Sequence, residues 1–211
     1  MFTDIICGIK MIKYNVNICD QIESELQVHF TKKCPNNCPF CVDALNKGLH
    51  SVGIKPDVMS IFQRISEHKD EIKSVGISGG EPMIYMTELL KLVKLIKNNT
   101  ELKVYIITSL PYAAYRHREE LFEIIDLCDG ISISPQHYSE EVADKIRGHK
   151  SLYDRQKFYT ELPHKDKITM NINMVKPFLC TKEEICHCIE HYNKLGFKSI
   201  KLAELFDRDD M

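Results

Sequence analysis

The sequence lacks a surplus of charge of either sign. Its 211 residues carry 28 Lys and Arg against 30 Asp and Glu, which gives a formal net charge of −2 with neutral histidines. A protein whose main partner is a nucleic acid uses an excess of basic groups to neutralise phosphates. The charge balance therefore argues against nucleic acid as the main partner.

Long apolar runs are also missing. The longest uncharged run, Val104–Tyr115, has twelve residues and contains a proline, whereas a membrane-spanning helix needs about 18 apolar residues. The segment Met1–Asn17 does not resemble an export signal, because Gly8, Lys10 and Lys13 interrupt it and no basic region precedes it. We expect a cytoplasmic protein that does not cross a membrane.

The chain contains no repeat, low-complexity tract or Gly/Ser-rich linker. With 44% hydrophobic and 27% charged residues, the composition is that of a globular protein and excludes disorder, a collagen-like chain and a coiled coil. We expect one core domain over residues 25–211, preceded by an N-terminal extension over residues 1–24. The alternating patches Asp4–Ile9 and Met11–Asn17 in this extension fit a hairpin or an added edge strand.

Short β-like runs alternate with amphipathic helical runs from residue 25 onward. The predicted strands are Glu25–Phe30, Ile72–Ser78, Lys103–Thr108, Gly130–Ser134, Lys167–Val175 and Lys198–Ala203. The predicted helices are Pro56–His68, Thr87–Lys97, Arg116–Leu127, Ser139–Arg147 and Thr181–Leu195. The last of these opens with a Thr N-cap and a Glu three positions on, which predicts a capping box. This alternation predicts an α/β fold with parallel strands and right-handed crossovers, either a partial (β/α)6 TIM-like barrel or an open doubly wound sheet. We favour the partial barrel, although the local pattern does not separate the two.

The two faces of the predicted strands differ in polarity. Apolar side chains occupy one face: Leu26, Val28, Ile131, Ile133, Ile168, Met170 and Ile172. Polar side chains occupy the other: Gln27, His29, Ser132, Ser134, Thr169, Asn171 and Asn173. Helices should cover the apolar face, which leaves a polar concave face able to bind a polar ligand. The alternatives are a water-filled groove or mutually paired polar groups.

Nine cysteines cannot all pair, which favours thiolate and metal chemistry over disulfides. Cys34, Cys38 and Cys41 form a CxxxCxxC triplet just after the first predicted core strand, on a loop rich in Pro and Asn. Zinc usually recruits a fourth Cys or His, whereas a cubane iron–sulfur cluster held by three thiolates keeps one iron free. His29 or His50 could complete a zinc site, so that reading stays open.

The triplet, with Phe40 just before its last cysteine, resembles the signature of the radical S-adenosylmethionine (radical SAM) superfamily. Ser78-Gly79-Gly80-Glu81-Pro82, at the end of the second predicted core strand, is similar to the second motif of that family. Glycines at this position allow close backbone approach to a ligand. The resemblance implies a 4Fe-4S cluster on Cys34, Cys38 and Cys41, and S-adenosylmethionine against Phe40 and Gly79–Pro82.

Further positions resemble the family over residues 25–204. The implied cofactor-binding residues are Thr108, Ser132, Asn173, the Leu202 backbone and Arg147, whose guanidinium would meet the methionine carboxylate. Arg147 resembles the arginine of a subgroup that contains the molybdenum-cofactor cyclase and peptide-modifying enzymes; the alternative is an exposed arginine before a Gly helix cap. Thr108-Ser109-Leu110-Pro111 and Ser134-Pro135-Gln136-His137 depart from the usual motifs and leave the substrate pocket undefined.

The resemblance implies an enzyme that cleaves S-adenosylmethionine to a 5′-deoxyadenosyl radical, which removes hydrogen from a small-molecule or peptide substrate. It also implies oxygen sensitivity and an electron donor such as flavodoxin or ferredoxin. Alternatives are a viperin-like nucleotide-modifying enzyme, a glycyl-radical-type activase acting on a partner protein, and a non-catalytic iron–sulfur protein. Only eight residues follow Ala203, so the closing sixth helix is missing, and we expect a truncated chain or a partner on the last strand.

The remaining cysteines and a histidine pair receive no site. Cys180, Cys186 and Cys188 could suggest an auxiliary cluster, but 186 and 188 point about 200° apart on a helix. His187 and His191 share a helix face without the glutamate of a zinc-protease motif. Cys7, Cys19 and Cys128 are expected to be core or surface thiols.

Overall fold

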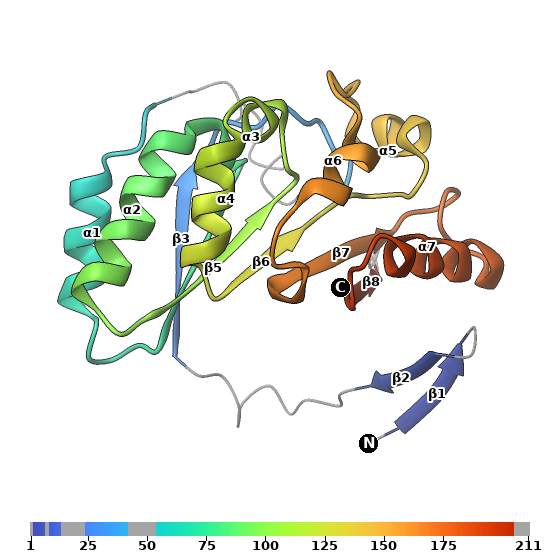
Figure 1. The fold of residues 1–211 in the computed structure, drawn as a ribbon, viewed down its shortest axis with the longest axis horizontal. Helices are drawn as coiled ribbons and strands as arrows, with labels where there is room; N and C mark the ends of the chain where they lie inside the picture. Colours follow the sequence, from blue (N-terminus) through green and yellow to red (C-terminus); the bar gives the residue numbers. More distant parts are fainter. Residues whose placement is uncertain (1, 7–8, 14–23, 42–53, 205–211) are drawn as a thin grey trace.

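The structure is a computed structural model that describes residues 2–6, 9–13, 24–41 and 54–204. Figure 1 shows a parallel sheet with helices along it, and a separate hairpin near the N-terminus. The hairpin consists of β1 (Phe2–Ile6) and β2 (Ile9–Lys13), paired antiparallel. Of the two expectations for the extension, the hairpin is therefore confirmed. Among the described residues it forms its own sheet and does not pair with the core.

Six parallel strands form the core sheet in sequence order. They are β3 (Glu25–Thr31), β4 (Ser74–Gly79), β5 (Lys103–Thr108), β6 (Gly130–Ile133), β7 (Ile168–Met174) and β8 (Ser199–Glu204). A doubly wound sheet reverses its strand order at a switch point, whereas here each strand lies beside its predecessor throughout. The structure therefore decides between the two predicted architectures and confirms the partial barrel.

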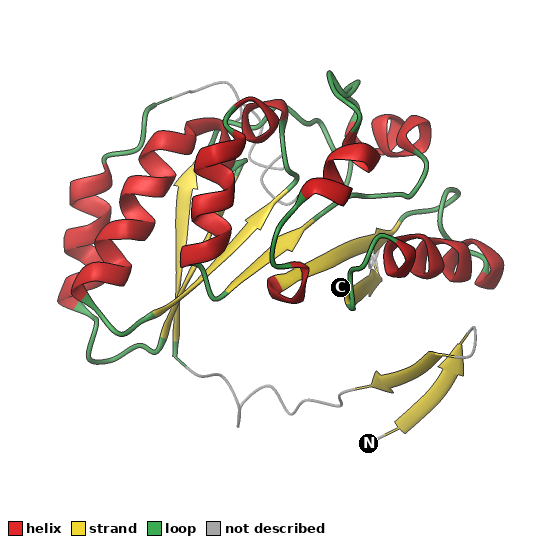
Figure 2. Ribbon diagram, in the orientation of Figure 1, coloured by secondary structure: helices red, strands yellow, loops and turns green. Residues whose placement is uncertain are grey.

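Helices connect the strands, as Figure 2 shows. They are α1 (Val58–Glu67), α2 (Met86–Asn99), α3 (Tyr112–Arg116), α4 (Arg118–Leu127), α5 (Glu140–Arg147), α6 (Arg155–Glu161) and α7 (Lys182–Lys194), with short 3-10 turns η2 (Pro82–Tyr85) and η3 (Lys165–Lys167). The predicted capping box at the start of α7 is present, since the Thr181 side chain accepts from the Glu184 backbone and the Glu184 side chain accepts in return. The helices α3 and α6 were not predicted.

The predicted division of the two sheet faces is confirmed. Ile131, Ile133, Ile168, Met170 and Ile172 are at most 3% exposed and belong to the core between sheet and helices. On the other face Gln27 and His29 are exposed, and Ser132, Thr169, Asn171 and Asn173 are half-buried. Parallel strands that are covered on both faces are apolar on both sides, whereas one face of this sheet carries polar side chains.

Several sequence predictions concern residues that the structure does not describe. Residues 205–211 and His50, Cys7 and Cys19 lie outside the described residues, as does any element after β8. Within the described residues β8 pairs with β7 alone. No helix in the described ranges is long and apolar enough to cross a membrane, and the expected cytoplasmic location stays a prediction, as do the domain boundaries.

Candidate functional site

The three cysteines of the triplet lie on one loop at the carboxyl end of β3. We call residues 31–41 the cysteine loop. Cys34, Cys38 and Cys41 are all half-buried, and the Cys41 amide donates to the Cys38 carbonyl at 3.1 Å. Burial raises the pKa of Cys34 to about 12 and that of Cys38 to about 11, and the neighbouring thiols add to both. Their thiolates therefore need a bound cation, because the protein around them disfavours negative charge.

The donor set of this loop fits an iron–sulfur cluster better than a single ion. No three His, Cys, Asp or Glu side chains among the described residues are placed to hold one metal ion. Three thiolates on one zinc would stand about 3.8 Å apart, given Zn–S bonds of about 2.3 Å in a tetrahedron. In a cubane each cysteine binds a different iron, which spaces the sulfurs more widely. The donor set therefore fits the cluster, whereas a zinc site completed by His50 is not tested, because residue 50 lies outside the described residues.

Two glycines at the end of β4 support the cysteine loop. The Gly80 amide donates to the Thr31 carbonyl at 2.6 Å, and the Glu81 amide donates to the Lys33 carbonyl at 2.8 Å. A Cβ added at Gly80 would lie 2.4 Å from the Lys33 carbonyl oxygen, and one at Gly79 would lie 2.5 Å from that of Thr31. Gly79 also has φ of 131°, which favours glycine. The close neighbour of these glycines is thus the cysteine loop; their contact with S-adenosylmethionine stays a prediction.

Glu81 joins the cysteine loop to β5. Its side chain is 1% exposed and accepts from Thr108 Oγ1 at 2.7 Å, Ser109 N at 2.7 Å, Ser109 Oγ at 2.6 Å and Met83 N at 3.1 Å. Burial raises the pKa of Glu81, and the donors oppose this shift. The Asn36 side-chain amide donates to Ser109 Oγ at 2.9 Å. Ser109, which departs from the family pattern, therefore links the cysteine loop to Glu81, and Thr108 serves the same network.

Arg147 lies at the end of α5 and is fully buried. Its guanidinium donates to Glu140 Oε1 at 2.5 Å, to Asp144 Oδ1 at 2.7 Å and to the Pro135 carbonyl at 3.1 Å. Its carbonyl accepts from the Asn37 amide of the cysteine loop at 2.7 Å. The alternative of an exposed arginine is therefore wrong, although Gly148 does cap α5 with φ of 62°. The predicted contact with a methionine carboxylate stays a prediction.

The other predicted site residues spread along the concave face and the β8 edge. Ser132 pairs in register with Ile107 on one side and Thr169 on the other. The Asn173 side chain donates to Gln136 Oε1 at 3.4 Å, Leu202 is half-buried on β8, and Phe40 is half-buried in the cysteine loop. The cysteines, Gly79–Pro82, Thr108 and Arg147 are thus brought together, and Ser132 and Asn173 lie on the concave face. The Leu202 side chain, in register with Ile172, packs against the core on the other face, so only its backbone is available to a cofactor.

Sequence reasoning missed several residues of this region. Gln136 is 4% exposed with a left-handed φ of 73°, and its side chain contacts Asn173. Tyr105 and Ile107 on β5 are 36% and 42% exposed and share the concave face with Ser132. The sequence held no signal for the last two, because Val104–Ile107 are four consecutive apolar residues and only the structure shows that alternate positions of β5 are buried.

The remaining cysteines and histidines do not form a second centre among the described residues. Cys180 is exposed, and Cys128 and Cys188 are buried. Cys186 is disulfide-bonded, whereas the sequence analysis favoured thiolate and metal chemistry over disulfides. His191 Nε2 contacts Gln156 Oε1 at 2.7 Å.

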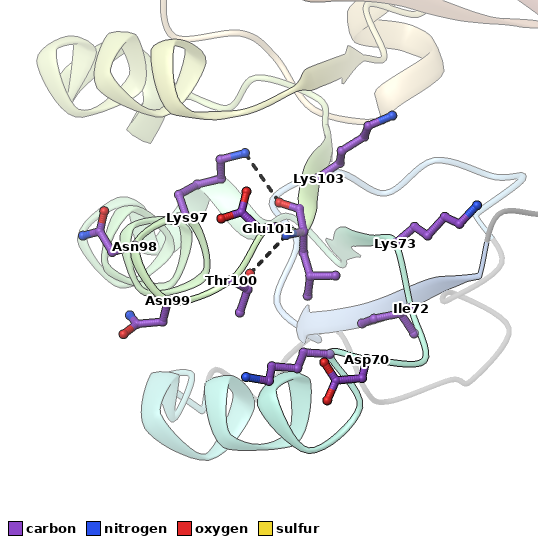
Figure 3. A pocket seen from close by; sticks show the side chains of 11 residues that line it. Asp70, Ile72, Lys73, Lys97, Asn98, Asn99, Thr100, Glu101 and Lys103 are labelled. Atoms are coloured by element: carbon purple, nitrogen blue, oxygen red, sulfur yellow. Dashed lines mark hydrogen bonds between the residues drawn. The ribbon is translucent and has the colours of Figure 1, made fainter.

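A cavity lies at the amino ends of the strands, away from the cysteine loop. It measures about 710 Å³ and is lined by the segments Lys69–Lys73 and Lys97–Lys103 (Figure 3). These segments precede β4 and β5, so the cavity opens at the amino ends of the strands. Ligands of parallel β/α folds bind at the carboxyl ends, which is where the cysteine loop lies. We therefore assign the site to the cysteine loop.

Comparisons with known proteins bear on the fold and the family of the chain. No curated protein matches the sequence. The fold resembles the radical S-adenosylmethionine methyltransferase TsrM from Kitasatospora setae, with a TM-score of 0.64 and 13% identity, over 86% of this chain and 36% of that one. It also resembles anSMEcpe, solved with bound AdoMet, with a TM-score of 0.59 and 16% identity, over 87% of this chain and 51% of that one.

The chain thus spans about a third to a half of the length of these solved structures. At such low identity the likeness shows the fold alone. A sequence model of the Radical SAM superfamily matches residues 28–203, a range that contains the cysteine loop, Gly79–Pro82, the strands β4 to β7 and most of β3 and β8. The chain therefore belongs to the Radical SAM superfamily.

Proposed function

We propose that this protein uses a 4Fe-4S cluster and S-adenosylmethionine to remove a hydrogen atom from a small-molecule or peptide substrate. The observation that carries the proposal is the anchoring of the cysteine loop. Gly80, Ser109 and Arg147 each hydrogen-bond to it, from β4, from the end of β5 and from the end of α5. Three independent anchors hold the thiols in place at the carboxyl edge of the sheet, as a preorganised centre requires.

The residues present can be given roles toward these cofactors. Cys34, Cys38 and Cys41 would hold the cluster, which when bound supplies the electron that cleaves the sulfonium of S-adenosylmethionine. The Gly79–Pro82 segment would accept from the ammonium group, and Ser132 and Asn173 offer a hydroxyl and a carboxamide to the ribose. The family resemblance implies that Phe40 and the Leu202 backbone would contact S-adenosylmethionine and that Arg147 would meet its methionine carboxylate. The protein positions these groups and shields them from water.

The concave face supports a substrate that is partly polar and partly apolar. Thr169 and Asn171 present polar groups from β7, while Tyr105 and Ile107 expose apolar surface on β5. Small-molecule and peptide substrates both meet this description. Within the superfamily, we propose that the chain is related to the subgroup that contains the molybdenum-cofactor cyclase and peptide-modifying enzymes.

The test is anaerobic reconstitution followed by measurement of 5′-deoxyadenosine with dithionite as reductant. We expect about four irons and four sulfides per chain, and release of 5′-deoxyadenosine that depends on the cluster. The variant Cys38→Ala should lose both, because three thiolates are the set that the loop supplies. Cys180→Ala is the matched control, since Cys180 is exposed and lies away from the loop.

The alternatives give different results in the same assay. A cluster without 5′-deoxyadenosine release would indicate a non-catalytic iron–sulfur protein and contradict the proposal. Zinc in the purified protein without iron uptake would contradict it as well. Release that rises on addition of a nucleotide or of a partner protein would point to the viperin-like enzyme or to the activase.

A further inference from the structure

The backbone adopts an unfavourable conformation directly after β5, in the segment that departs from the family pattern. Leu110 is fully buried there and has φ of 55°, in the left-handed region that glycine alone adopts without steric cost. Leu110 also precedes Pro111, and a residue before proline is restricted toward extended conformations. Its aliphatic side chain offers no local hydrogen bond to offset the cost. Neighbouring groups therefore have to hold the turn formed by Ser109 and Leu110 in place.

Two side chains from the segment around the start of α6 donate to the carbonyls of this turn. The Tyr153 hydroxyl donates to the Leu110 carbonyl at 2.5 Å, and the Arg155 guanidinium donates to the Ser109 carbonyl. The Leu110 amide donates in addition to Thr108 Oγ1 at 2.9 Å. The peptide groups on both sides of the Leu110 Cα atom are thus held by hydrogen bonds. Because φ and ψ describe the rotation of these two peptide groups, the bonds fix both backbone angles of Leu110.

The segment that supplies the two donors is itself fixed. Arg155 is 3% exposed, and its Nε lies 3.3 Å from Ser151 Oγ and 3.4 Å from Glu140 Oε1. Ser151 Oγ donates to the Tyr153 carbonyl at 2.9 Å, and the Arg155 guanidinium lies 5.3 Å from the centroid of the Tyr153 ring. Burial raises the pKa of Tyr153, so its hydroxyl keeps the proton that it donates.

The position of the turn sets the position of Ser109 beside the cysteine loop. The Ser109 amide and Oγ donate to Glu81 Oε2 at 2.7 Å and 2.6 Å, and Ser109 Oγ accepts from the Asn36 side chain at 2.9 Å. Asn36 lies between Cys34 and Cys38 in the sequence. A rotation of the peptide group between residues 109 and 110 would draw Ser109 away from these partners and free this side of the loop.

We propose that Tyr153 and Arg155 are positioning residues for the cysteine loop. They hold Leu110 in its left-handed conformation, and the turn in that conformation places Ser109 on the loop. Their effect on a bound cluster rests on the proposed function, whereas their hold on the turn and on the loop does not. The two parts are therefore measured separately.

The first experiment measures amide hydrogen exchange of the metal-free full chain by NMR. The rate at a protected amide reports the free energy of local opening. In Tyr153→Phe, which keeps the ring and removes the hydroxyl, we expect the Ser109 and Leu110 amides to exchange up to about tenfold faster, as loss of one hydrogen bond implies. The amide of Ile106, which lies within β5 and is fully buried, should keep its rate.

Tyr115→Phe is the matched control for this variant. The Tyr115 ring stacks on that of Tyr153 with centroids 4.8 Å apart, so the same atom is removed from the same aromatic stack without touching the turn. Exchange at Ser109 and Leu110 should stay within about twofold of wild type. Equal acceleration at the turn and at Ile106, or equal acceleration in both variants, would overturn the proposal.

The second experiment relieves the strain at the turn. Arg155→Met should accelerate exchange of the Ser109 amide by about tenfold or more, because a charged donor is lost. In the Leu110→Gly background, where the left-handed conformation carries no steric cost, the same substitution should accelerate it less than threefold. Each comparison is made within one background, so the loss of the buried Leu110 side chain cancels. Equal acceleration in both backgrounds would overturn the proposal.

Arg118→Met is the matched control for the arginine. Arg118 pairs with Glu161 of α6 and lies 5.7 Å from the ring centroid of Phe158, so it also binds α6 but lacks the bond to the turn. The Ser109 amide should keep its rate in this variant. Acceleration as large as that in Arg155→Met would show a general loosening of α6 and would overturn the proposal.

The third experiment follows the consequence for the cysteine loop. In the metal-free chain the Asn37 amide, which donates to the Arg147 carbonyl, should exchange faster in Tyr153→Phe and Arg155→Met. After anaerobic reconstitution, both variants should release iron to a chelator several-fold faster than wild type and the two control variants. Faster exchange at the turn with wild-type rates at Asn37 would overturn the positioning role. A wild-type chain that takes up no iron would contradict the proposed function, while the exchange rates would still decide the hold on the loop.

Discussion

The variant Gly80→Ala should detach the cysteine loop from β4. The added Cβ would lie 2.4 Å from the Lys33 carbonyl oxygen and 2.7 Å from that of Lys32. Both neighbours are backbone atoms, so no side chain can rotate away. A shift of at least about 0.6 Å is needed to reach 3.0 Å, below which real Cβ contacts are essentially absent. Such a shift breaks the hydrogen bonds from Gly80 to Thr31 and from Glu81 to Lys33.

The expected loss is about 2–6 kcal/mol in the free energy of unfolding. Overpacking costs about 1–3 kcal/mol, and each of the two hydrogen bonds contributes about 0.5–1.5 kcal/mol. Native domains are stable by about 5–15 kcal/mol, so the variant should fold and yet bind iron poorly. The reason is that the loop carrying Cys34, Cys38 and Cys41 loses its support.

Urea unfolding of the metal-free chain, followed by far-UV circular dichroism, measures the stability. Iron and sulfide content after anaerobic reconstitution measures the site. Gly130→Ala is the control, because its Cβ would meet the side-chain ring of Tyr105 at 3.0 Å and the Lys167 carbonyl oxygen only at an ordinary 3.6 Å, with no cysteine-loop atom among these neighbours. Wild-type stability together with full iron content in Gly80→Ala would refute the close packing between β4 and the cysteine loop.

Three further predictions follow from the same network. Arg147→Ala should destabilise the protein by about 3–5 kcal/mol, because the carboxylates of Glu140 and Asp144 lose their buried partner; unchanged thermal stability with weaker S-adenosylmethionine binding would instead favour the carboxylate contact. Ser109→Ala should lower iron retention while Ser134→Ala does not, since only Ser109 bridges Asn36 and Glu81; equal iron loss in both would contradict the bridge. Burial raises the pKa of Glu81 above its usual 4.5. The stability that this raised pKa adds to the folded protein is therefore fully present below pH 4.5 and is lost as the pH rises through the pKa of the folded state. The free energy of unfolding of the wild type should therefore fall relative to that of Glu81→Gln as the pH rises above 4.5, and urea titrations at several pH values would measure this. The same pH dependence in both proteins would contradict the raised pKa.

Local sequence signals predicted much of the fold. The Thr181–Glu184 capping box and the Gly148 helix cap both occur as expected. The alternation along β7 placed Thr169 and Asn171 opposite Met170 and Ile172, because a strand has a side-chain period of two. Such signals act within a few residues, which is why they are readable from sequence. The short helices α3 and α6 were missed because five and seven residues carry too few periodic positions.

The roles of individual site residues depended on contacts between distant segments. From sequence, Gly79 and Gly80 suggested space for a ligand, whereas their nearest neighbour is the backbone of residues 31–33. Thr108 suggested a cofactor contact, and the structure shows its hydroxyl on Glu81, 27 residues away in the chain. These pairings require the crossovers to be folded first, so no local pattern encodes them.

The sequence by itself determined the chemistry available to this protein. The three thiols lie within eight residues and the glycine-rich strand end within five. The donor set and the family motif can therefore be identified without any coordinates. Only the tertiary structure decided the order of the six strands, the burial of Arg147 among carboxylates and the hydrogen-bond network from Glu81 through Ser109 to the cysteine loop. Each of these brings together residues from separate βα units, whose relative positions are set by packing of the whole sheet against its helices.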